Sequence, residues 1–176
     1  PPPPTRGGAA GESSGGHLTA LLATTSDTNE FQKHPVTRKA SSAIQAASPW
    51  CGPTDFLKLN DVKASQDYSR RQSAPSRLIG APIKEAPEKC RQANPITYVS
   101  KGDPPCFIVH GDRDFVVPLN QSELLHAALK KAGAPSTLHV VKGGEHGFSK
   151  LTPANDEIVK KVMNFFDRQF KPEGGR

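Results

Sequence analysis

Three glycine-rich stretches of the sequence carry side chains that could act together in one reaction. Residues 11–15 read GESSG, a Gly-x-Ser-x-Gly pattern that lifts Ser13 out of the backbone at a strand-to-helix turn. Residues 110–118, HGDRDFVVP, offer Asp112 and Asp114, and residues 143–148, GGEHGF, offer His146. A serine hydroxyl is a poor nucleophile at neutral pH and needs a base within hydrogen-bond reach, and that base needs a carboxylate to orient it. The three stretches therefore indicate acyl-transfer chemistry.

Several neighbouring side chains compete for the same roles. Asp112 is interpreted as a turn-forming carboxylate, because aspartates commonly bond to the backbone of turns that follow strands. His110 closes an apolar run and is interpreted as a structural histidine. His17 is expected to pack in the first turn of a helix, and Glu12 and Glu145 to make contacts within their own loops.

Two aromatic residues near these stretches have two possible roles. Trp50 and Phe148 could line an acyl or aromatic pocket, or could lie at the edge of an ordinary core.

The segments between these stretches predict the elements that must position them. Helices are expected over residues 16–24, 120–133 and about 153–170, where apolar residues recur at helical spacing. Short apolar runs predict strands at 44–48, 106–111 and 136–143. Strands and helices alternate, which predicts an α/β fold with a mostly parallel sheet. The loops at the carboxyl ends of its strands would then bring the polar side chains together.

The chain length predicts a single domain over residues 1–176. Residues 25–40 are polar and read as a loop. Residues 54–100 hold short helical pieces broken by prolines and read as a cap-like excursion between two strands. The only methionine is Met163, so the chain is expected to be a fragment or a processed form.

The composition excludes several classes of function. The net charge of +6 comes from scattered lysines and arginines, and only 6% of the residues are aromatic, so no nucleic-acid partner is expected. No apolar run is long enough to span a bilayer, which predicts a soluble protein without a membrane partner. Three cysteines without a Cys-x-x-Cys pair predict no metal site. Cys106 is expected to be a buried thiol, and a bridge between Cys51 and Cys90 is left open.

Four longer stretches resemble the C-terminal half of an α/β-hydrolase. They read GESSGGHLTALLATT, SPWCGPTDF, ANPITYVSKGDPPCFIVHGDRDFVVPLNQSELLHAALKKAGA and TLHVVKGGEHGF. Within that superfamily the chain is most similar, from about Thr5 to its end, to the feruloyl and acetylxylan esterase-like group, often labelled bacteroides feruloyl esterase-like. The resemblance implies a partial α/β-hydrolase fold, with a mostly parallel sheet flanked by helices and without the strands that usually precede the serine turn.

The resemblance also implies a role for each site residue. Ser13 would be the nucleophile, His146 the base and Asp114 the carboxylate that orients it, while the backbone N–H of Ser14 would form half of the oxyanion hole. The implied activity is the hydrolysis of carboxylic esters without a cofactor. Its substrates would be small-molecule or polysaccharide-linked esters, such as the carbohydrate-linked acetyl or feruloyl esters cleaved in xylan degradation. Export from the cell is a family expectation only.

The sequence departs from the family pattern at two points. The His-Gly-Gly loop that supplies the second oxyanion donor has no counterpart in the chain, and the segment RGGAA before the elbow lacks the β-branched residues a strand prefers. Two alternative interpretations stay open, a serine peptidase fragment of the prolyl oligopeptidase type and a non-catalytic truncated module.

Overall fold

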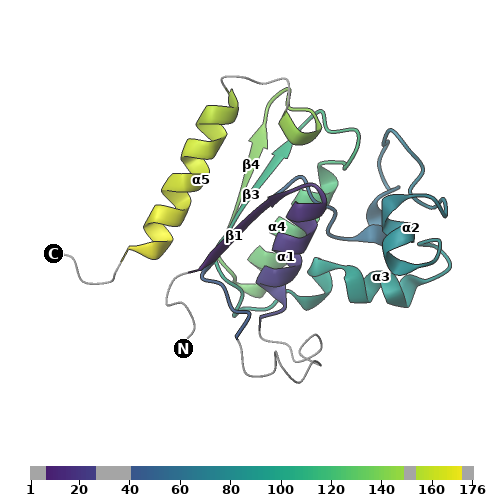
Figure 1. Ribbon diagram of the computed structural model, residues 1–176, viewed down its shortest axis with the longest axis horizontal. Coiled ribbons are helices and arrows are strands. Elements are labelled where there is room, and N and C mark those ends of the chain that lie inside the picture. Colours follow the sequence, from purple (N-terminus) through teal and green to yellow (C-terminus); the bar gives the residue numbers. More distant parts are fainter. Residues whose placement is uncertain (1–6, 27–40, 149–153, 172–176) are drawn as a thin grey trace.

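A four-stranded parallel sheet forms the centre of the molecule (Figure 1). The computed structural model describes residues 7–26, 41–148 and 154–171. Each strand pairs in parallel with the next one along the chain. The strands are β1 (Gly8–Glu12), β2 (Ala46–Trp50), β3 (Cys106–Gly111) and β4 (Ser136–Val141). All four carboxyl ends therefore lie at the same edge of the sheet, as the expected α/β fold requires.

Helices cover both faces of this sheet. α1 (Ser14–Thr24) and α4 (Asn120–Ala132) pack on one face, and α5 (Ala154–Phe170) lies against the other, apart from them in Figure 1. The segment between β2 and β3 carries two short helices, α2 (Ala74–Ile79) and α3 (Pro87–Ala93). The described residues also contain three short 3-10 helices, η1 (Phe56–Lys58), η2 (Pro95–Tyr98) and η3 (His146–Phe148).

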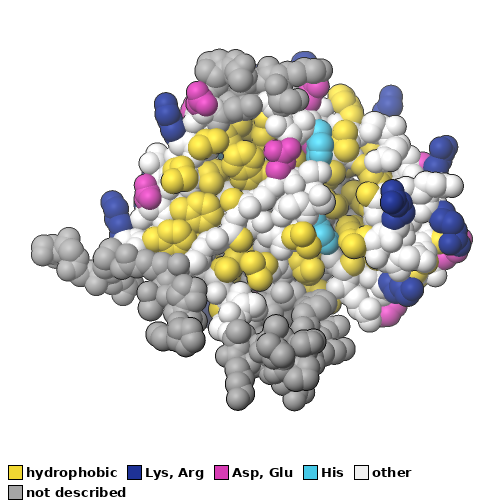
Figure 2. Space-filling model, viewed as in Figure 1, with side chains coloured by type: hydrophobic (Ala, Val, Ile, Leu, Met, Phe, Trp, Pro, Cys, Tyr) yellow, Lys and Arg dark blue, Asp and Glu magenta, His cyan; other side chains and the backbone are white. Residues whose placement is uncertain are grey.

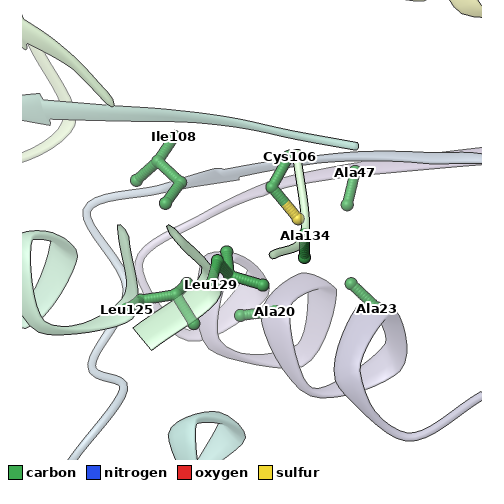
Figure 3. Packing of buried hydrophobic residues seen from close by; sticks show 8 residues of the cluster. All are labelled: Ala20, Ala23, Ala47, Cys106, Ile108, Leu125, Leu129 and Ala134. Atoms are coloured by element: carbon green, nitrogen blue, oxygen red, sulfur yellow. The ribbon is translucent and has the colours of Figure 1, made fainter. Parts of the chain in front are cut away.

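The alternation of side chains along β3 separates the two halves of the core. Ile108 points to the face covered by α1 and α4, whereas Val109 points to the face covered by α5, because successive strand residues face opposite ways. Figure 3 shows the first cluster, in which Leu125 and Leu129 of α4 fill the space below β3. Full burial of each of these side chains contributes roughly 1.5–3 kcal/mol.

The half of the core between the sheet and α5 explains why β1 has a glycine at position 8. Ile158 and Val162 of α5 are buried against Val109. A Cβ atom on Gly8 would lie 2.6 Å from the ring of Phe166. The strand forms over Gly8–Glu12 although it lacks β-branched residues. Its parallel pairing with β2 and the rings of Phe166 and Phe170 beside Gly8 stabilise it.

Several predicted boundaries were shifted. The first helix begins at Ser14, two residues before the expected start, and β2 begins at Ala46, two residues later than expected. The predicted loop over 25–40 lies outside the described residues beyond Ser26. The strand at 106–111 and the helix from 120 are confirmed, and Gly133 ends that helix with a φ of 84°.

The helix α2 is not among the predicted elements, although its sequence carries local signals of a helix start. Ser73 caps this helix by accepting a hydrogen bond from the N–H of Ser76, and Pro75 occupies its first turn. A proline inside a helix would break it, but in the first turn its missing N–H costs nothing, so Pro75 is compatible with α2.

The excursion over 54–100 has a small apolar cluster of its own and is tied to the helix that follows β3. The cluster consists of Phe56, Leu59, Tyr68, Ile83 and Cys90. The side chain of Gln121 at the start of α4 accepts hydrogen bonds from the N–H groups of Thr54 and Asp55, at 2.9 and 2.8 Å. The excursion is therefore held at the same edge of the sheet as the three glycine-rich stretches.

All three cysteines are buried and free, so the Cys51–Cys90 bridge left open by the sequence is not formed. No helix of the described residues could cross a bilayer. On the face shown in Figure 2, Lys and Arg side chains stand singly around the margin, mainly on the side of α2 and α3, while hydrophobic side chains occupy much of the middle.

Candidate active site

Ser13 lies at a sharp turn between the end of β1 and the start of α1. Its backbone has a φ of 55° and a ψ of −117°, a conformation that is strained for a residue with a side chain. Its N–H donates to the carbonyl of Trp50 at 2.9 Å, and its carbonyl accepts from the N–H of His17 at 3.0 Å. The structure thus has the strand, strained turn and helix that the Gly-x-Ser-x-Gly pattern requires.

Glycines around this turn permit the close approach of three backbone segments. A Cβ atom on Gly11 would lie 2.4 Å from the carbonyl oxygen of Gly15, and one on Gly16 would lie 2.3 Å from the carbonyl oxygen of Trp50. Neither space can hold a methyl group, because these neighbours are backbone atoms. The glycines are therefore needed for the turn to form in this geometry.

His146 connects Ser13 to Asp114. Its Nε2 lies 2.9 Å from the Ser13 Oγ, and its Nδ1 lies 2.7 Å from the Asp114 Oδ2. A carboxylate oxygen can only accept, so the Nδ1–H donates to Asp114 and leaves Nε2 free to accept from the serine hydroxyl. The structure therefore places the three predicted side chains in a single hydrogen-bonded row, although they come from loops that follow β1, β3 and β4.

The Asp114 carboxylate is completely buried and is held by further donors. Its Oδ1 accepts from the N–H groups of Val116 and Val117, at 2.9 and 2.8 Å. The His110 Nε2 lies 3.3 Å from its Oδ2 and 2.8 Å from the Val117 carbonyl. Since that carbonyl can only accept, His110 carries its proton on Nε2, and its Nδ1 accepts from the Ser122 hydroxyl at 2.6 Å.

These contacts move the pKa values of Asp114 and His146 in opposite directions. Burial works to raise the pKa of Asp114, but the hydrogen bonds from the two histidines and from Val117 outweigh it and lower the pKa to about 2. The hydrogen bond to Asp114 raises the pKa of His146 above its ordinary value, and burial opposes this only in part. The carboxylate is therefore charged at neutral pH and stabilises an imidazolium on His146.

Cys51 is a fourth neighbour that the sequence reading did not place here. It is fully buried, has a φ of 38°, and follows β2, where its N–H donates to the Val109 carbonyl at 2.9 Å. Its sulfur lies within 4.8 Å of a ring nitrogen of His146, and the thiol raises the pKa of that histidine. The sequence shows only that Cys51 follows a predicted strand, and this does not indicate which side chain it meets.

Cys51, Asp114 and His146 offer three atoms within 4.8 Å of one another, of types that bind zinc. However, the 2.7 Å between His146 Nδ1 and Asp114 Oδ2 is a hydrogen-bond distance. Two ligands bound tetrahedrally to one ion at about 2.0 Å would be roughly 3.3 Å apart. The arrangement suits a proton between these atoms better than a metal ion.

Asp112, His17 and His110, which are expected to have structural roles, make structural contacts. The Asp112 Oδ1 accepts from the N–H of Gly143 at 2.6 Å and so joins two loops. His17 is buried, donates from Nδ1 to the Pro53 carbonyl at 3.0 Å and stacks on Phe56. His110 is buried, as expected, but it also contacts Asp114, which the sequence reading missed.

Of the two aromatic residues with two possible roles, Phe148 lies in the core and Trp50 lies at its edge. Phe148 is buried with Val109 and Val141, and Trp50 packs against it. Glu12, which was expected to make loop contacts, places its carboxylate against Gly147, where a Cβ atom would lie 2.6 Å away. The residue before Ser13 therefore contacts the residue after His146.

A pocket of about 180 Å³ opens beside Ser13. Ser13, Ser14 and His17 form one wall, and Val116 and Val117 form part of another. Pro53 and the excursion supply the rest of the lining, and the residues of the excursion are Phe56, Leu59, Gln66, Tyr68, Ala74, Pro75 and Leu78. Ser14 is the first residue of α1, so its N–H has no acceptor within the helix and is available to a group bound at this wall.

Comparison with known proteins agrees with this architecture. Esterase LipQ of Mycobacterium tuberculosis is 29% identical over 156 residues, which cover 88% of this chain and 35% of LipQ. A probable carboxylic ester hydrolase of the same organism, LipM, is 32% identical over 110 residues, which cover 62% of this chain and 24% of LipM. The chain thus spans about a third or less of these curated relatives.

Solved structures show the same arrangement of elements. A truncated form of a carbohydrate esterase from gut microbiota matches 94% of this chain and 60% of its own, with a TM-score of 0.79 at 31% identity. A bifunctional GH43-CE protein of Bacteroides eggerthii matches 92% of this chain and 23% of its own, with a TM-score of 0.78 at 30% identity. The profile of the BD-FAE family matches residues 4–129. The chain therefore belongs to the BD-FAE family of α/β-hydrolase-like proteins, which confirms the resemblance read from its sequence.

Proposed function

We propose that this chain carries the catalytic serine, histidine and aspartate of a carboxylic ester hydrolase. The observation that carries the proposal is the row from Ser13 Oγ through His146 to Asp114, with contacts of 2.9 and 2.7 Å and the serine at a strained turn. The names of the related esterases and carbohydrate esterases support this class of reaction.

In the proposed reaction Ser13 attacks the carbonyl carbon of an ester. Its hydroxyl proton passes to His146 Nε2 as the bond from Oγ to the carbonyl carbon forms. The imidazolium is stabilised by Asp114, and the Ser14 N–H donates to the oxyanion of the tetrahedral intermediate. The bond to the leaving alcohol then breaks, and this alcohol takes its proton from His146. A water molecule repeats both steps and releases the acid. One oxyanion donor of this kind contributes about 3 kcal/mol to catalysis.

Carbohydrate-linked esters are the proposed substrate class. Two structural neighbours at 30% identity or above are described as a carbohydrate esterase and as a bifunctional GH43-CE protein, which supports a sugar hydroxyl as the leaving alcohol. Acetyl and feruloyl groups are the acyl groups that the sequence resemblance suggested for such esters.

The test is the hydrolysis of p-nitrophenyl acetate by the purified chain beside its Ser13→Ala variant. The expected result is turnover by the wild type and a background rate for the variant. Labelling by a fluorophosphonate probe should depend on Ser13 in the same way, and a chelator should leave the rate unchanged, since no step uses a metal. Equal rates of hydrolysis by the two proteins, together with no labelling of either, would favour a non-catalytic module. Cleavage of an acylated peptide instead of esters would favour a peptidase.

A further inference from the structure

A second hollow, an open groove of about 380 Å³, adjoins the pocket beside Ser13. It lies between α1 and the pair α2 and α3, which stand on one side of α1 in Figure 1. The proposed reaction uses none of its side chains. Its lining consists of His17, Leu18, Leu21, Leu78, Ile79, Lys89, Gln92 and Ala93.

The groove and the pocket share two lining residues, His17 and Leu78. Leu78 is 63% exposed, so its side chain is not packed into the core and can turn aside for a ligand. His17 is buried and stacks on Phe56, so its ring is fixed at the junction. The boundary at Leu78 is therefore a movable rim on the surface of the protein.

Two helices carry side chains from the pocket into the groove. Along α1, Ser14, Leu18 and Leu21 lie at positions i, i+4 and i+7, which share one face of a helix. Ser14 lines the pocket, and the two leucines line the groove about one and two turns further on. Along α2, Ala74 lines the pocket and Leu78, four residues later, lines both hollows. A ligand that extends from the pocket along these faces enters the groove.

The side chains of the groove favour an aliphatic ligand. Five of its eight residues are leucine, isoleucine or alanine, and His17 is its only ring, so an aromatic ligand finds few partners for stacking there. Leu18 is 63% exposed and leaves apolar surface for a ligand to cover. Each methylene group that becomes buried against such surface can raise the affinity by about fourfold.

The acyl group is the part of an ester that extends in this direction. Ser13 and Ser14 line the pocket, but His146 does not. In the proposed reaction the leaving alcohol takes its proton from His146 and must lie next to that residue. The acyl chain therefore points from Ser13 into the pocket, and a longer chain continues along α1 toward Leu18.

We propose that this groove is a subsite for the distal part of an aliphatic acyl chain, so that the protein prefers esters of medium-chain fatty acids to esters of short-chain acids. The inference rests on the proposed function, because it uses Ser13 and His146 to orient the ester. It narrows the choice of acyl group, since the two carbons of an acetyl group are too few to extend from Ser13 to Leu18.

The test measures binding and does not depend on turnover. The affinities of methyl octanoate and methyl butyrate are measured by calorimetric titration of the Ser13→Ala variant, which removes the proposed nucleophile. The octanoate carries four more methylene groups and should bind at least about tenfold more tightly, as burial of two of them allows. Adding Leu18→Gln keeps a residue that favours a helix but places a polar group in the groove. This change should lower the ratio of the two affinities at least about threefold and leave the affinity for the butyrate unchanged.

The matched control is Met163→Gln in the same background. Met163 is also an apolar helix residue and is 56% exposed, but it belongs to α5 and lines neither the pocket nor the groove. This variant should keep the ratio of the parent. Equal affinities of the two esters in the parent, no binding of either ester, an unchanged ratio after Leu18→Gln, or an equal fall in both variants would overturn the inference. Binding with the expected ratios but no turnover by the wild type would overturn the proposed function alone.

Discussion

The buried carboxylate of Asp114 lies between two histidines, with its Oδ2 at 2.7 Å from His146 Nδ1 and at 3.3 Å from His110 Nε2. The two histidines differ in what they can do. His146 is partly exposed and contacts Ser13, whereas His110 is completely buried and contacts only groups behind the carboxylate. Asp114 is therefore oriented from behind by one imidazole while it orients the other.

Replacing Asp114 by asparagine is expected to lower kcat about 10⁴-fold. The amide can donate to His146 Nδ1 and would then favour the tautomer with its proton on Nε2, which cannot accept from Ser13. The rate is measured with p-nitrophenyl acetate. Asp112→Asn is the matched control, because Asp112 bonds to the N–H of Gly143 and should leave kcat within a few-fold of wild type. A larger loss of kcat for Asp112→Asn than for Asp114→Asn would show that Asp112, and not Asp114, orients His146.

Ser122→Ala is expected to lower the free energy of unfolding by about 1–3 kcal/mol. The substitution leaves His110 Nδ1 buried without the hydroxyl that lies 2.6 Å away. Ser136→Ala removes a similar contact, 2.9 Å to His126 Nδ1, at a partly exposed site where water can replace it, and should cost less than about 1 kcal/mol. Urea unfolding at neutral pH measures both free energies. Equal losses in the two variants would show that the hydrogen bond between Ser122 and His110 adds no particular stability.

The sequence predicted most of the strands, and it predicted that Ser13, Asp114 and His146 lie close together. The run CFIVHG is apolar on both faces, as a central parallel strand must be, and became β3 without a boundary error. Ser13, Asp114 and His146 each follow a strand, and parallel strands bring their carboxyl ends to one edge. Their contact therefore depended on topology, which the alternation of elements had already indicated.

The contacts of Cys51 and Tyr68 could not be predicted in this way. Cys51 reaches His146 because β2 lies beside β3 in one particular register, and no local pattern specifies a register. Tyr68 reaches the pocket because the excursion folds around a small cluster whose contacts are distant in sequence. The helix α2 differs from both, since Ser73 and Pro75 are local signals of a helix start and a proline is equally typical of a helix break.

The pH dependence of hydrolysis should respond to Cys51. His146 acts as a base only when neutral, so the rate rises as pH increases through its pKa, which Asp114 and then Cys51 raise above the ordinary value. Removing the thiol by Cys51→Ala lowers that pKa and should shift the rising limb of kcat/KM to lower pH. Cys90→Ala removes an equally buried free thiol from the excursion and should leave the limb in place. If the limb moves in both variants or in neither, the thiol of Cys51 does not act on His146.

Adding a methyl group at Gly16 should disrupt the elbow, whereas the same change at Gly15 should not. In Gly16→Ala the new Cβ would lie 2.3 Å from the Trp50 carbonyl oxygen, which also accepts the N–H of Ser13 at 2.9 Å. The backbone must move to relieve this contact, and a displacement of about 1 Å at a reacting group costs roughly 100-fold in rate. At Gly15 the added Cβ meets nothing within 4 Å outside its own helix, and alanine favours the helix by up to about 1 kcal/mol. Gly15→Ala should therefore retain activity and gain stability in urea unfolding, while Gly16→Ala loses both. Full activity in Gly16→Ala would mean that catalysis does not need Ser13 in the strained conformation seen here.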